Sequence, residues 1–322
     1  MKVLTVIPGS SEGSSMIFAK RQVLSLIKEG VESRVFFLSS RTSLTILYKE
    51  SLRFRKQIKE FNPDIIHCHY GTMTSFFCVV NTNKKLVITF HGSDINKTPF
   101  DGFFKDLFGR ILSQLSILKA KGIFCVSESL SKKVWWRNEI VRVVPIGINI
   151  DMFIPIDRNE ARKRLGWSND KKIVLFNSNN PIVKRLDIAK NVIEILQKNN
   201  PDYMLYLLEG EISPDTIPLY INASDCLLIC SDNEGSPMMV KEAMACNLPI
   251  VGVDVGDVKE RILEVSNCIV STQNAIDLSI AIEKVIQKNE RTNGRDVLIK
   301  QELTENIIAN KIITIFENIY KG

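Results

Sequence analysis

The chain has 322 residues, of which 45% are hydrophobic and 24% charged, and it holds only 11 prolines. This composition excludes an intrinsically disordered, collagen-like or low-complexity chain and predicts a folded protein of about two domains. The longest apolar runs have four to seven residues, far fewer than the roughly 20 that span a bilayer, so no transmembrane helix is expected. Residues 1–9 pass from one lysine into an apolar strand without a signal-peptide cleavage pattern, so we expect no export.

The charge is unevenly divided between the two halves of the chain. Residues 1–150 hold 22 Lys and Arg against 11 Asp and Glu, whereas residues 151–322 hold 20 against 25. A basic half favours an anionic partner, either phospholipid headgroups or nucleic acid, and an ordinary solvated face explains it about as well. No nucleic-acid-binding module is recognisable, so no such partner is expected. The seven cysteines lack C-x-x-C spacing and are typical of buried thiols in a reducing cytoplasm.

Short β-branched strands alternate with helical patterns through the first half of the chain. A strand at residues 3–7 precedes a helix at 15–28 that Gly30 ends, and further strands are expected at 33–38, 65–69, 86–90, 122–126 and 141–145. The strands at 3–7 and 65–69 are almost continuously apolar, as parallel strands covered on both faces should be. This β-α-β order predicts a Rossmann-like first domain over residues 1–150.

A polar, irregular segment follows residues 145–149 and predicts the boundary to a second domain over residues 151–303. The second domain restarts with a strand at 172–176, and its other elements are expected at 203–208, 226–230, 237–246, 250–253, 268–270 and 275–287. A last helix at 302–320 is expected to pack back across both domains, which makes residues 304–322 a third segment. The predicted fold class is therefore α/β, with two doubly wound domains facing each other across a cleft where ligands of such folds bind.

The most informative segment joins the strand at 226–230 to the helix that follows it. Glu234 and Gly235 lie in the connecting loop, Ser236 is expected to be the N-cap, and Pro237 is expected to be the first helical residue, where its missing N–H costs nothing. The alternative is a routine strand-loop-helix junction with solvated acids.

The start of this helix is a candidate anion site. The N–H groups of Met238, Met239 and Val240 lie at the positive end of the helix dipole and can hold a phosphate or diphosphate. Glu242 lies one turn further on the same face, where a carboxylate can accept hydrogen bonds from sugar or ribose hydroxyls.

Glu234 and Glu242 are separated by seven residues and resemble the E-x7-E signature of retaining GT-B glycosyltransferases, the glycogen-synthase-like group 1 family. The surrounding residues 233–251, the run 254–257 and the run 143–149 are similar to members that build cell-surface polysaccharides, teichuronic-acid-type enzymes among them. The resemblance covers nearly the whole chain. It implies a cytoplasmic hexosyltransferase, peripheral on the inner face of the plasma membrane, that moves a sugar from a UDP-sugar to a glycan or lipid-linked saccharide.

Further site residues follow from the same resemblance. Lys184 resembles the family lysine that neutralises the donor diphosphate, and a cation there stabilises the leaving nucleotide. The family arginine five residues earlier is Asn179 here, and we expect Arg185 to replace it as a donor-binding residue. Without the motif, a surface lysine would be the simpler interpretation of Lys184.

In the first domain, His91 ends a strand and resembles the family histidine near the reacting sugar. Gly13 and Ser14, in the loop after the first strand, are expected to bind the donor or acceptor, with Ser14 in place of the second glycine that the family often shows. His67 and His69 lie on one side of a strand. A metal pair is conceivable, but without a third ligand hydrogen-bonded histidines are the favoured interpretation.

The resemblance also implies a reaction without a metal cofactor. No two aspartates are spaced D-x-D, so cations and a helix dipole are expected to replace a divalent ion in stabilising the departing diphosphate. The family implies retention of configuration by front-face attack, with the leaving phosphate taking the acceptor's proton. Glu234 would then orient the transferred sugar rather than act as a nucleophile.

Two basic and aromatic segments, 49–59 and 100–110, are expected either to lay the first domain on an anionic membrane or to be amphipathic helices with solvated lysines. The base pocket is expected near residues 210–212. Two other functions stay open: a sugar-nucleotide epimerase of the same fold, and a non-catalytic nucleotide-sugar-binding partner.

Overall fold

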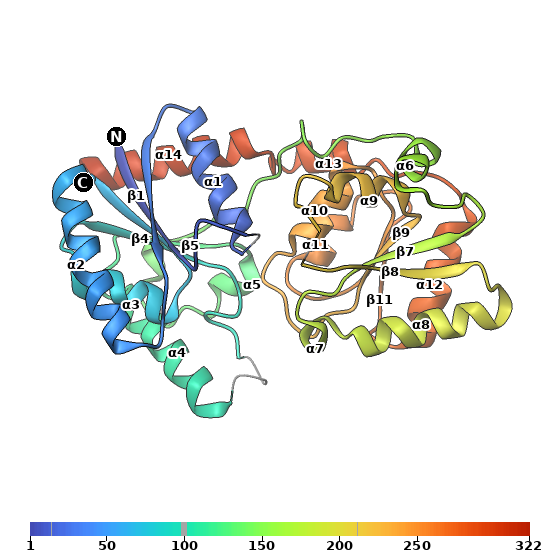
Figure 1. Ribbon diagram of the computed structural model, residues 1–322, viewed down its shortest axis with the longest axis horizontal. Coiled ribbons are helices and arrows are strands. Elements are labelled where there is room, and N and C mark those ends of the chain that lie inside the picture. Colours follow the sequence, from blue (N-terminus) through green and yellow to red (C-terminus); the bar gives the residue numbers. More distant parts are fainter. Residues whose placement is uncertain (14, 98–101, 211) are drawn as a thin grey trace. The chain divides into compact units, whose positions relative to one another are not determined.

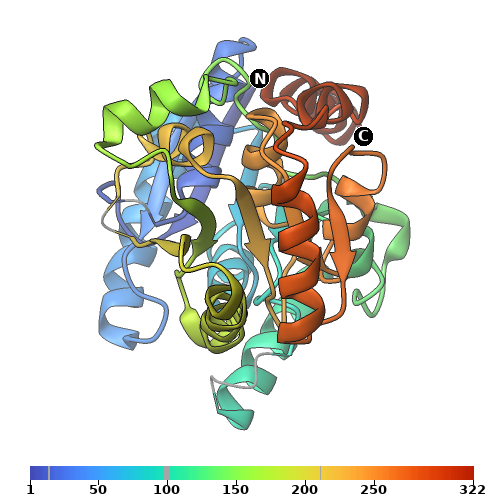
Figure 2. The same cartoon turned by 90° about the vertical axis from the view of Figure 1, so that its right-hand side faces the viewer.

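The computed structural model describes residues 1–13, 15–97, 102–210 and 212–322. The chain divides into two compact units (Figure 1), and Figure 2 gives a second view of the same ribbon. Unit 1 comprises Met1–Gly147 together with Glu305–Gly322, and unit 2 comprises Ile148–Thr304. Each unit has its own parallel sheet, as expected for doubly wound α/β domains.

Unit 1 contains a parallel sheet in the order β2-β1-β3-β4-β5-β6. Its strands are β1 (Lys2–Pro8), β2 (Glu32–Leu38), β3 (Ile65–His69), β4 (Lys85–Phe90), β5 (Gly122–Cys125) and β6 (Val141–Val143). In the register, Val3 of β1 lies opposite Ser33 on one side and Ile65 on the other. Residues of β3 and β4 are buried on both faces, which explains their largely apolar sequences, and the two histidines of β3 are buried as well.

Helices cover both faces of the unit 1 sheet (Figure 1). One layer holds α1 (Ile17–Lys28) and α14 (Glu305–Lys321), and the other holds α2 (Leu44–Phe61), α3 (Thr72–Asn81) and α4 (Phe103–Ile117). The short elements α5 (Glu128–Ser131) and η1 (Asn138–Ile140) precede β6. Ile312 and Phe316 of α14 pack with Val3 and Phe124 of the sheet. The C-terminal helix therefore completes the core of unit 1.

Unit 2 contains a parallel sheet in the order β11-β10-β9-β7-β8. Its strands are β7 (Lys172–Asn177), β8 (Tyr203–Leu208), β9 (Cys226–Ile229), β10 (Ile250–Val253) and β11 (Ile269–Ser271). Alternate residues of β7 contribute to two separate cores, because Val174 packs in one cluster and Leu175 in the other.

The two cores of unit 2 lie under different helices. The cluster around Val174 includes residues of α8 (Leu186–Asn199) and α12 (Ala275–Gln287). The cluster around Leu175 includes residues of α9 (Ile217–Ala223), α10 (Met238–Ala245), α11 (Val258–Ile262) and α13 (Gly294–Lys300). The remaining helices are α6 (Arg158–Leu165), which packs on α9, and α7 (Pro181–Lys184). None of the helices in the described residues is long and apolar enough to cross a bilayer.

Candidate functional site

An ion pair connects two loops at the carboxyl ends of β7 and β9. The ammonium group of Lys184 binds Glu234 Oε1, and the Ser231 hydroxyl donates a hydrogen bond to the same oxygen at 2.8 Å. The two loops are also joined through the backbone, where the Asp232 N–H donates to the Val183 carbonyl at 2.9 Å. The structure therefore brings together Lys184 and Glu234, two predicted site residues 50 positions apart in the sequence.

Arg185 lies beside this pair but binds other carboxylates. Its guanidinium is paired with Asp187 at 2.8 Å and with Asp232 at 3.1 Å, and these hydrogen bonds raise its pKa further. Asn179, in the position of the expected arginine, lies next to Gly210: a Cβ added to that glycine would come within 3.4 Å of Asn179 Oδ1. Residue 211, in the expected base pocket, lies outside the described residues.

The start of α10 differs from the expectation by one residue. Pro237, not Ser236, is the N-cap, and it makes no side-chain capping hydrogen bond. The Ser236 hydroxyl, which was expected to cap the helix, instead donates to Asp257 Oδ2 at 2.7 Å. Asp257 lies 21 residues further along the chain.

The expected set of free N–H groups at α10 is also reduced. The Val240 N–H donates to the Pro237 carbonyl at 3.2 Å. Met238 and Met239 are the first two helical residues, and by position their N–H groups have no acceptor within the helix. A group that binds at this helix start would therefore meet two donors rather than three. Glu242, one turn further on, is buried.

Buried charged side chains form a hydrogen-bonded network with Ser236, in the loop between β9 and α10. Lys241 is fully buried, and its ammonium group donates to the Ser236 hydroxyl at 3.1 Å. Asp257 Oδ2, which accepts from Ser236, also accepts from Arg261 Nε at 2.8 Å. Burial lowers the pKa of Lys241 to about 8, and Asp257 opposes this shift. Sequence reasoning missed this network, although Asp257 and Arg261 show the i, i+4 spacing of a helical ion pair.

Gly256 fixes the position of the loop that carries Glu234. Its φ is +62°, and a Cβ at this position would lie 2.9 Å from the Gly235 carbonyl oxygen and 3.0 Å from Glu234 Cβ. Only glycine combines this backbone conformation with so close an approach. Gly256 therefore belongs to the candidate site, which sequence reasoning did not recognise.

In unit 1, His69 at the carboxyl end of β3 and His91 just after β4 lie near His67, the middle residue of β3. His69 Nδ1 and His91 Nε2 are 3.0 Å apart, and His67 Nε2 is 2.7 Å from Thr89 Oγ1. The ring of Phe18 lies 4.7 Å from that of His91. The prediction of hydrogen-bonded histidines is confirmed. In the described part of the chain, no three metal-ligating side chains lie together as a metal site.

Burial controls the protonation of the two strand histidines. Burial lowers the pKa of His67 to about 3. The pKa of His69 is also well below its usual value, through burial first and then through the neighbouring His67 and His91. Both imidazole rings are therefore neutral near pH 7.

Asp94 holds the loop after β4 in place, and sequence reasoning missed it. Its carboxylate accepts hydrogen bonds from the N–H groups of His91 at 3.1 Å, Gly92 at 2.9 Å and Gly71 at 2.9 Å. Burial raises the pKa of Asp94, and these N–H groups oppose the shift. The sequence does contain an indication of this role, because Asp94 follows His91 by three residues. An aspartate in a turn often accepts hydrogen bonds from the neighbouring backbone.

The loop after β1 borders a pocket of about 270 Å³ in unit 1. The pocket is lined by Pro8, Gly9, Ser15, Met16, Leu38, Ser39, Ser40, Arg41 and Tyr70. The expected residue Gly13 is exposed in this loop, where its carbonyl accepts from Lys20 Nζ at 3.0 Å. Ser14 lies outside the described residues. The structure thus places a hollow beside part of the predicted loop, with Arg41 and Tyr70 as unpredicted members.

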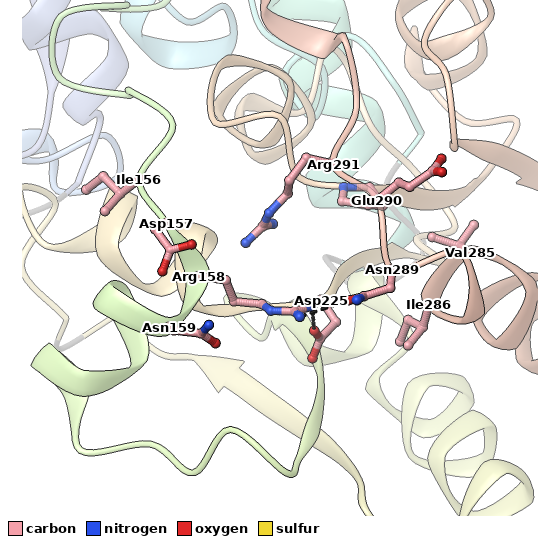
Figure 3. Close-up of a pocket in the computed structure, with 11 residues that line it drawn as sticks. Ile156, Asp157, Arg158, Asn159, Asp225, Val285, Ile286, Asn289, Glu290 and Arg291 are labelled. Atoms are coloured by element: carbon pink, nitrogen blue, oxygen red, sulfur yellow. Dashed lines mark hydrogen bonds and ion pairs between the residues drawn. The ribbon is translucent and has the colours of Figure 1, made fainter.

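A second pocket of about 220 Å³ lies in unit 2 at the amino ends of β9 and β10. Arg158 enters it and binds Asp225 at 2.5 Å, and the guanidinium of Arg291 approaches from the other side (Figure 3). Burial and then the charge of Arg158 lower the pKa of Arg291 to about 10. None of the predicted site residues lines this pocket, because it lies at the amino ends of the strands and the predicted residues follow the carboxyl ends.

Comparisons with known families match both units. The profile of Glycosyltransferase Family 4 matches residues 6–152. The profile of Glycosyl transferases group 1 matches residues 206–302, which include Glu234, Glu242 and the buried network. The two matches together span most of the chain and agree with the family expected from the E-x7-E segment.

Several curated proteins are similar in sequence. The putative teichuronic acid biosynthesis glycosyltransferase TuaC of Bacillus subtilis is 27% identical over 72% of this chain and 64% of its own length. The N-acetyl-alpha-D-glucosaminyl L-malate synthase of Bacillus anthracis is 24% identical over 80% of this chain and 74% of its own length. An N,N'-diacetylbacillosaminyl-diphospho-undecaprenol alpha-1,3-N-acetylgalactosaminyltransferase of Campylobacter jejuni is 28% identical over 58% of this chain and 56% of its own length. The chain thus spans just under two thirds of TuaC.

Solved structures agree in fold. Sucrose-phosphate synthase from Thermosynechococcus elongatus matches with a TM-score of 0.79 and 15% identity over 99% of both chains. Anabaena HepE in complex with UDP matches with a TM-score of 0.75 and 15% identity, over 99% of this chain and 100% of the other. The chain, with its two Rossmann-like units, therefore has the GT-B fold and belongs to the glycosyltransferase group 1 family.

Proposed function

We propose that this protein is a retaining, metal-independent hexosyltransferase that moves a sugar from a UDP-sugar to a glycan or lipid-linked saccharide. The observation that carries the proposal is the binding of Lys184 to Glu234 beside the start of α10. It places one ammonium group, one carboxylate and the two N–H donors of Met238 and Met239 on adjoining loops. Groups of these kinds can bind a diphosphate and sugar hydroxyls.

In the proposed reaction, Lys184 and the start of α10 stabilise the negative charge that develops on the departing diphosphate. The bond between the anomeric carbon and the phosphate oxygen breaks, and the acceptor oxygen bonds to that carbon on the same face. The acceptor's proton goes to the leaving phosphate oxygen. Glu234, released from Lys184 by the incoming diphosphate, binds hydroxyls of the transferred sugar, as does Glu242 within α10. His91 stays a predicted catalytic residue.

The relatives' names support the proposed acceptor class. One relative is named for teichuronic acid biosynthesis, and another for a sugar carried on diphospho-undecaprenol. We extend these names to a role in cell-surface polysaccharide biosynthesis, at the inner face of the plasma membrane. HepE, which shares the fold, was solved with UDP, and this supports UDP as the nucleotide.

Lys184→Ala tests the donor site directly. Loss of the ammonium group should weaken UDP-sugar binding and lower turnover by roughly 10²-fold, because one stabilising group of the departing charge is gone. The matched control is Lys171→Ala, since Lys171 forms an exposed pair with Asp202 at 2.9 Å in the same unit and should leave both values unchanged. Titration of UDP- and GDP-sugars by thermal shift, with Glu242→Ala as a second donor-site variant, measures binding.

Release of UDP with and without candidate acceptors measures turnover and separates the alternatives. Acceptor-dependent release that persists in EDTA supports transfer without a metal. An epimerase would convert the UDP-sugar without an acceptor, and a non-catalytic partner would be stabilised by it without turnover. Equal kinetics for Lys184→Ala and Lys171→Ala would exclude the proposed donor site.

A further inference from the structure

The pocket of about 220 Å³ in unit 2 lies away from the proposed donor site and has a cationic lining (Figure 3). We call it the amino-end pocket. Arg158, the first residue of α6, and Arg291, which follows α12, both line it, and Val285 and Ile286 contribute an apolar wall. Its volume is many times the roughly 15 Å³ that one water molecule needs, so it has room for a polyatomic ligand.

Three arginines share one paired carboxylate at this pocket. Asp225 Oδ1 binds Arg158 at 2.5 Å, and Asp225 Oδ2 binds Arg162 at 2.6 Å. Oδ2 also accepts from the Ile173 N–H at 2.6 Å, so both oxygens of this acid are occupied. Arg291 forms no ion pair with any carboxylate of the described residues. Three guanidinium groups against one carboxylate therefore leave two positive charges without a counter-charge.

Arg291 itself is incompletely satisfied. Its guanidinium donates to the Asn222 carbonyl, and its Nη1 atom is buried without a hydrogen-bond partner. Burial lowers the pKa of Arg291 to about 10; the charges of Arg158 and Arg162 add to this shift, and Asp225 opposes it. A buried charged N–H group without an acceptor is unfavourable. This part of the pocket therefore favours a ligand that accepts hydrogen bonds and carries negative charge.

Two further acids line the pocket but form no ion pair with Arg291. Asp157 and Glu290 are both exposed. The Asp157 carboxylate caps α6, because its Oδ1 accepts from the Glu160 N–H at 3.0 Å. The side chain of Glu290 points away from Arg291 in Figure 3. Water and salt screen exposed charges of this kind, so these acids offset the buried excess only weakly.

Capping of α9 explains only part of the arginine cluster. Arg162 Nε donates to the Ala223 carbonyl at 2.9 Å, and Arg291 donates to the Asn222 carbonyl, so both satisfy carbonyl groups at the end of this helix. The carboxyl end of a helix carries only about half a negative charge, which leaves most of the excess. A phosphate monoester carries about −1.5 to −2 at pH 7 and presents three acceptor oxygens, so its charge matches what remains.

We propose that the amino-end pocket binds a phosphate dianion, as free phosphate or as a small phosphate monoester, through Arg158 and Arg291. The apolar side chains of Val285 and Ile286 suit the carbon atoms of an ester. The site is separate from the proposed donor site, because β9 begins directly after Asp225 and the loop that carries Glu234 follows its other end. The inference is therefore independent of the proposed transfer reaction.

Isothermal titration calorimetry of the full chain, in buffer without phosphate or sulfate, tests this site. Inorganic phosphate and glycerol 3-phosphate should bind both the unchanged protein and Lys184→Ala, whose proposed donor site lacks its ammonium group, and glycerol should bind neither. Arg291→Gln should weaken phosphate binding at least tenfold in the Lys184→Ala background. The matched control is Arg164→Gln, because Arg164 pairs with Glu160 on the exposed surface of α6 and should leave binding unchanged. Tighter binding of glycerol 3-phosphate would assign the pocket to an ester, and tighter binding of inorganic phosphate to the free ion.

Urea denaturation separates phosphate binding from a purely structural role of Arg291. Phosphate should raise the unfolding midpoint of the unchanged protein and of Arg164→Gln, but not that of Arg291→Gln. Arg291→Lys, which keeps the charge without the planar fork, should bind phosphate with intermediate affinity. A structural role alone predicts that Arg291→Gln lowers the midpoint equally with and without phosphate, and this result would overturn the proposal. So would loss of phosphate binding in Lys184→Ala, which would place the anion at the donor site.

Discussion

The two units place very different chemistry at the same end of a parallel sheet. In unit 1, the buried His67 and His69 of β3 are hydrogen-bonded to a threonine hydroxyl and to the partly buried His91, respectively. In unit 2, the loops after β7 and β9 carry the pair of Lys184 with Glu234, supported by Lys241 and its neighbours. A charged ligand can exchange with ion pairs, whereas neutral imidazoles suit an uncharged sugar. One topology thus provides two electrostatic environments, and each responds differently to substitution and pH.

The largest effect should come from Gly256→Ala in unit 2. The new Cβ would meet Gly235 and Glu234 in a backbone conformation that already disfavours a side chain. We expect a loss of about 4 kcal/mol in the free energy of unfolding, together with weakened UDP-sugar binding. Chemical denaturation and donor titration measure the two effects.

The matched control for this change is Gly166→Ala. Gly166 has a similar φ of +69° but open space where its Cβ would lie, so only the conformational cost of about 1 kcal/mol remains. If both variants lose the same stability and bind donor equally, the close approach of Gly256 to Glu234 does not matter.

A fall in pH should reveal the contribution of His67, in unit 1, to the free energy of unfolding. The folded pKa of His67 is about 3, below its ordinary value of 6.5, so the unfolded chain binds the extra proton as pH falls below 6.5. The stabilisation from this neutral histidine is present above pH 6.5 and declines toward pH 3. Between pH 6.5 and 4 the loss should be about 3 kcal/mol. Urea denaturation of the unchanged protein and of His67→Gln measures it, and parallel pH profiles would contradict the assignment.

A rise in pH should reveal the contribution of Lys241, in unit 2, to the free energy of unfolding. The folded pKa of Lys241 is about 8 against an ordinary 10.5, so between these values the unfolded chain holds the proton and stability rises with pH. Relative to Lys241→Met, the unchanged protein should gain about 2 kcal/mol between pH 8 and 9.5. Lys171→Met, at an exposed pair, serves as the control and should show no such gain. A constant difference between the unchanged protein and Lys241→Met would mean that Lys241 stays charged.

The strands were predictable because local sequence determines them. β3, β8 and β10 begin and end where the sequence predicts. β3 and β10 are buried along their whole length, whereas β8 is a partly exposed edge strand. Short helices such as α7 and α11 were missed, because four or five residues show no helical period and their ends depend on packing. The place of α14 on the first sheet likewise depends on contacts with strands some 200 to 300 residues earlier.

The candidate site was predictable where its residues form a motif. Glu234 and its neighbours could be located from spacing, but its partner Lys184 was expected at the diphosphate and not on the carboxylate. Ser236 followed the rules for a helix cap, yet a distant aspartate binds its hydroxyl. Lys241 looks like a solvated helical lysine in the sequence, because nothing local reveals that it is buried. Tertiary contacts decide these cases.

Unit 1 is built from two separate stretches of the chain, Met1–Gly147 and Glu305–Gly322. This affects the order in which the two units can fold during synthesis. Residues 148–304 form one continuous unit and can fold as soon as they leave the ribosome. The sheet of unit 1 is made earlier, but its covering helix α14 is made only with residues 305–321. Until then Val3 and Phe124 lack part of their apolar cover, so the unit translated first would be the second to mature and the one more dependent on chaperones.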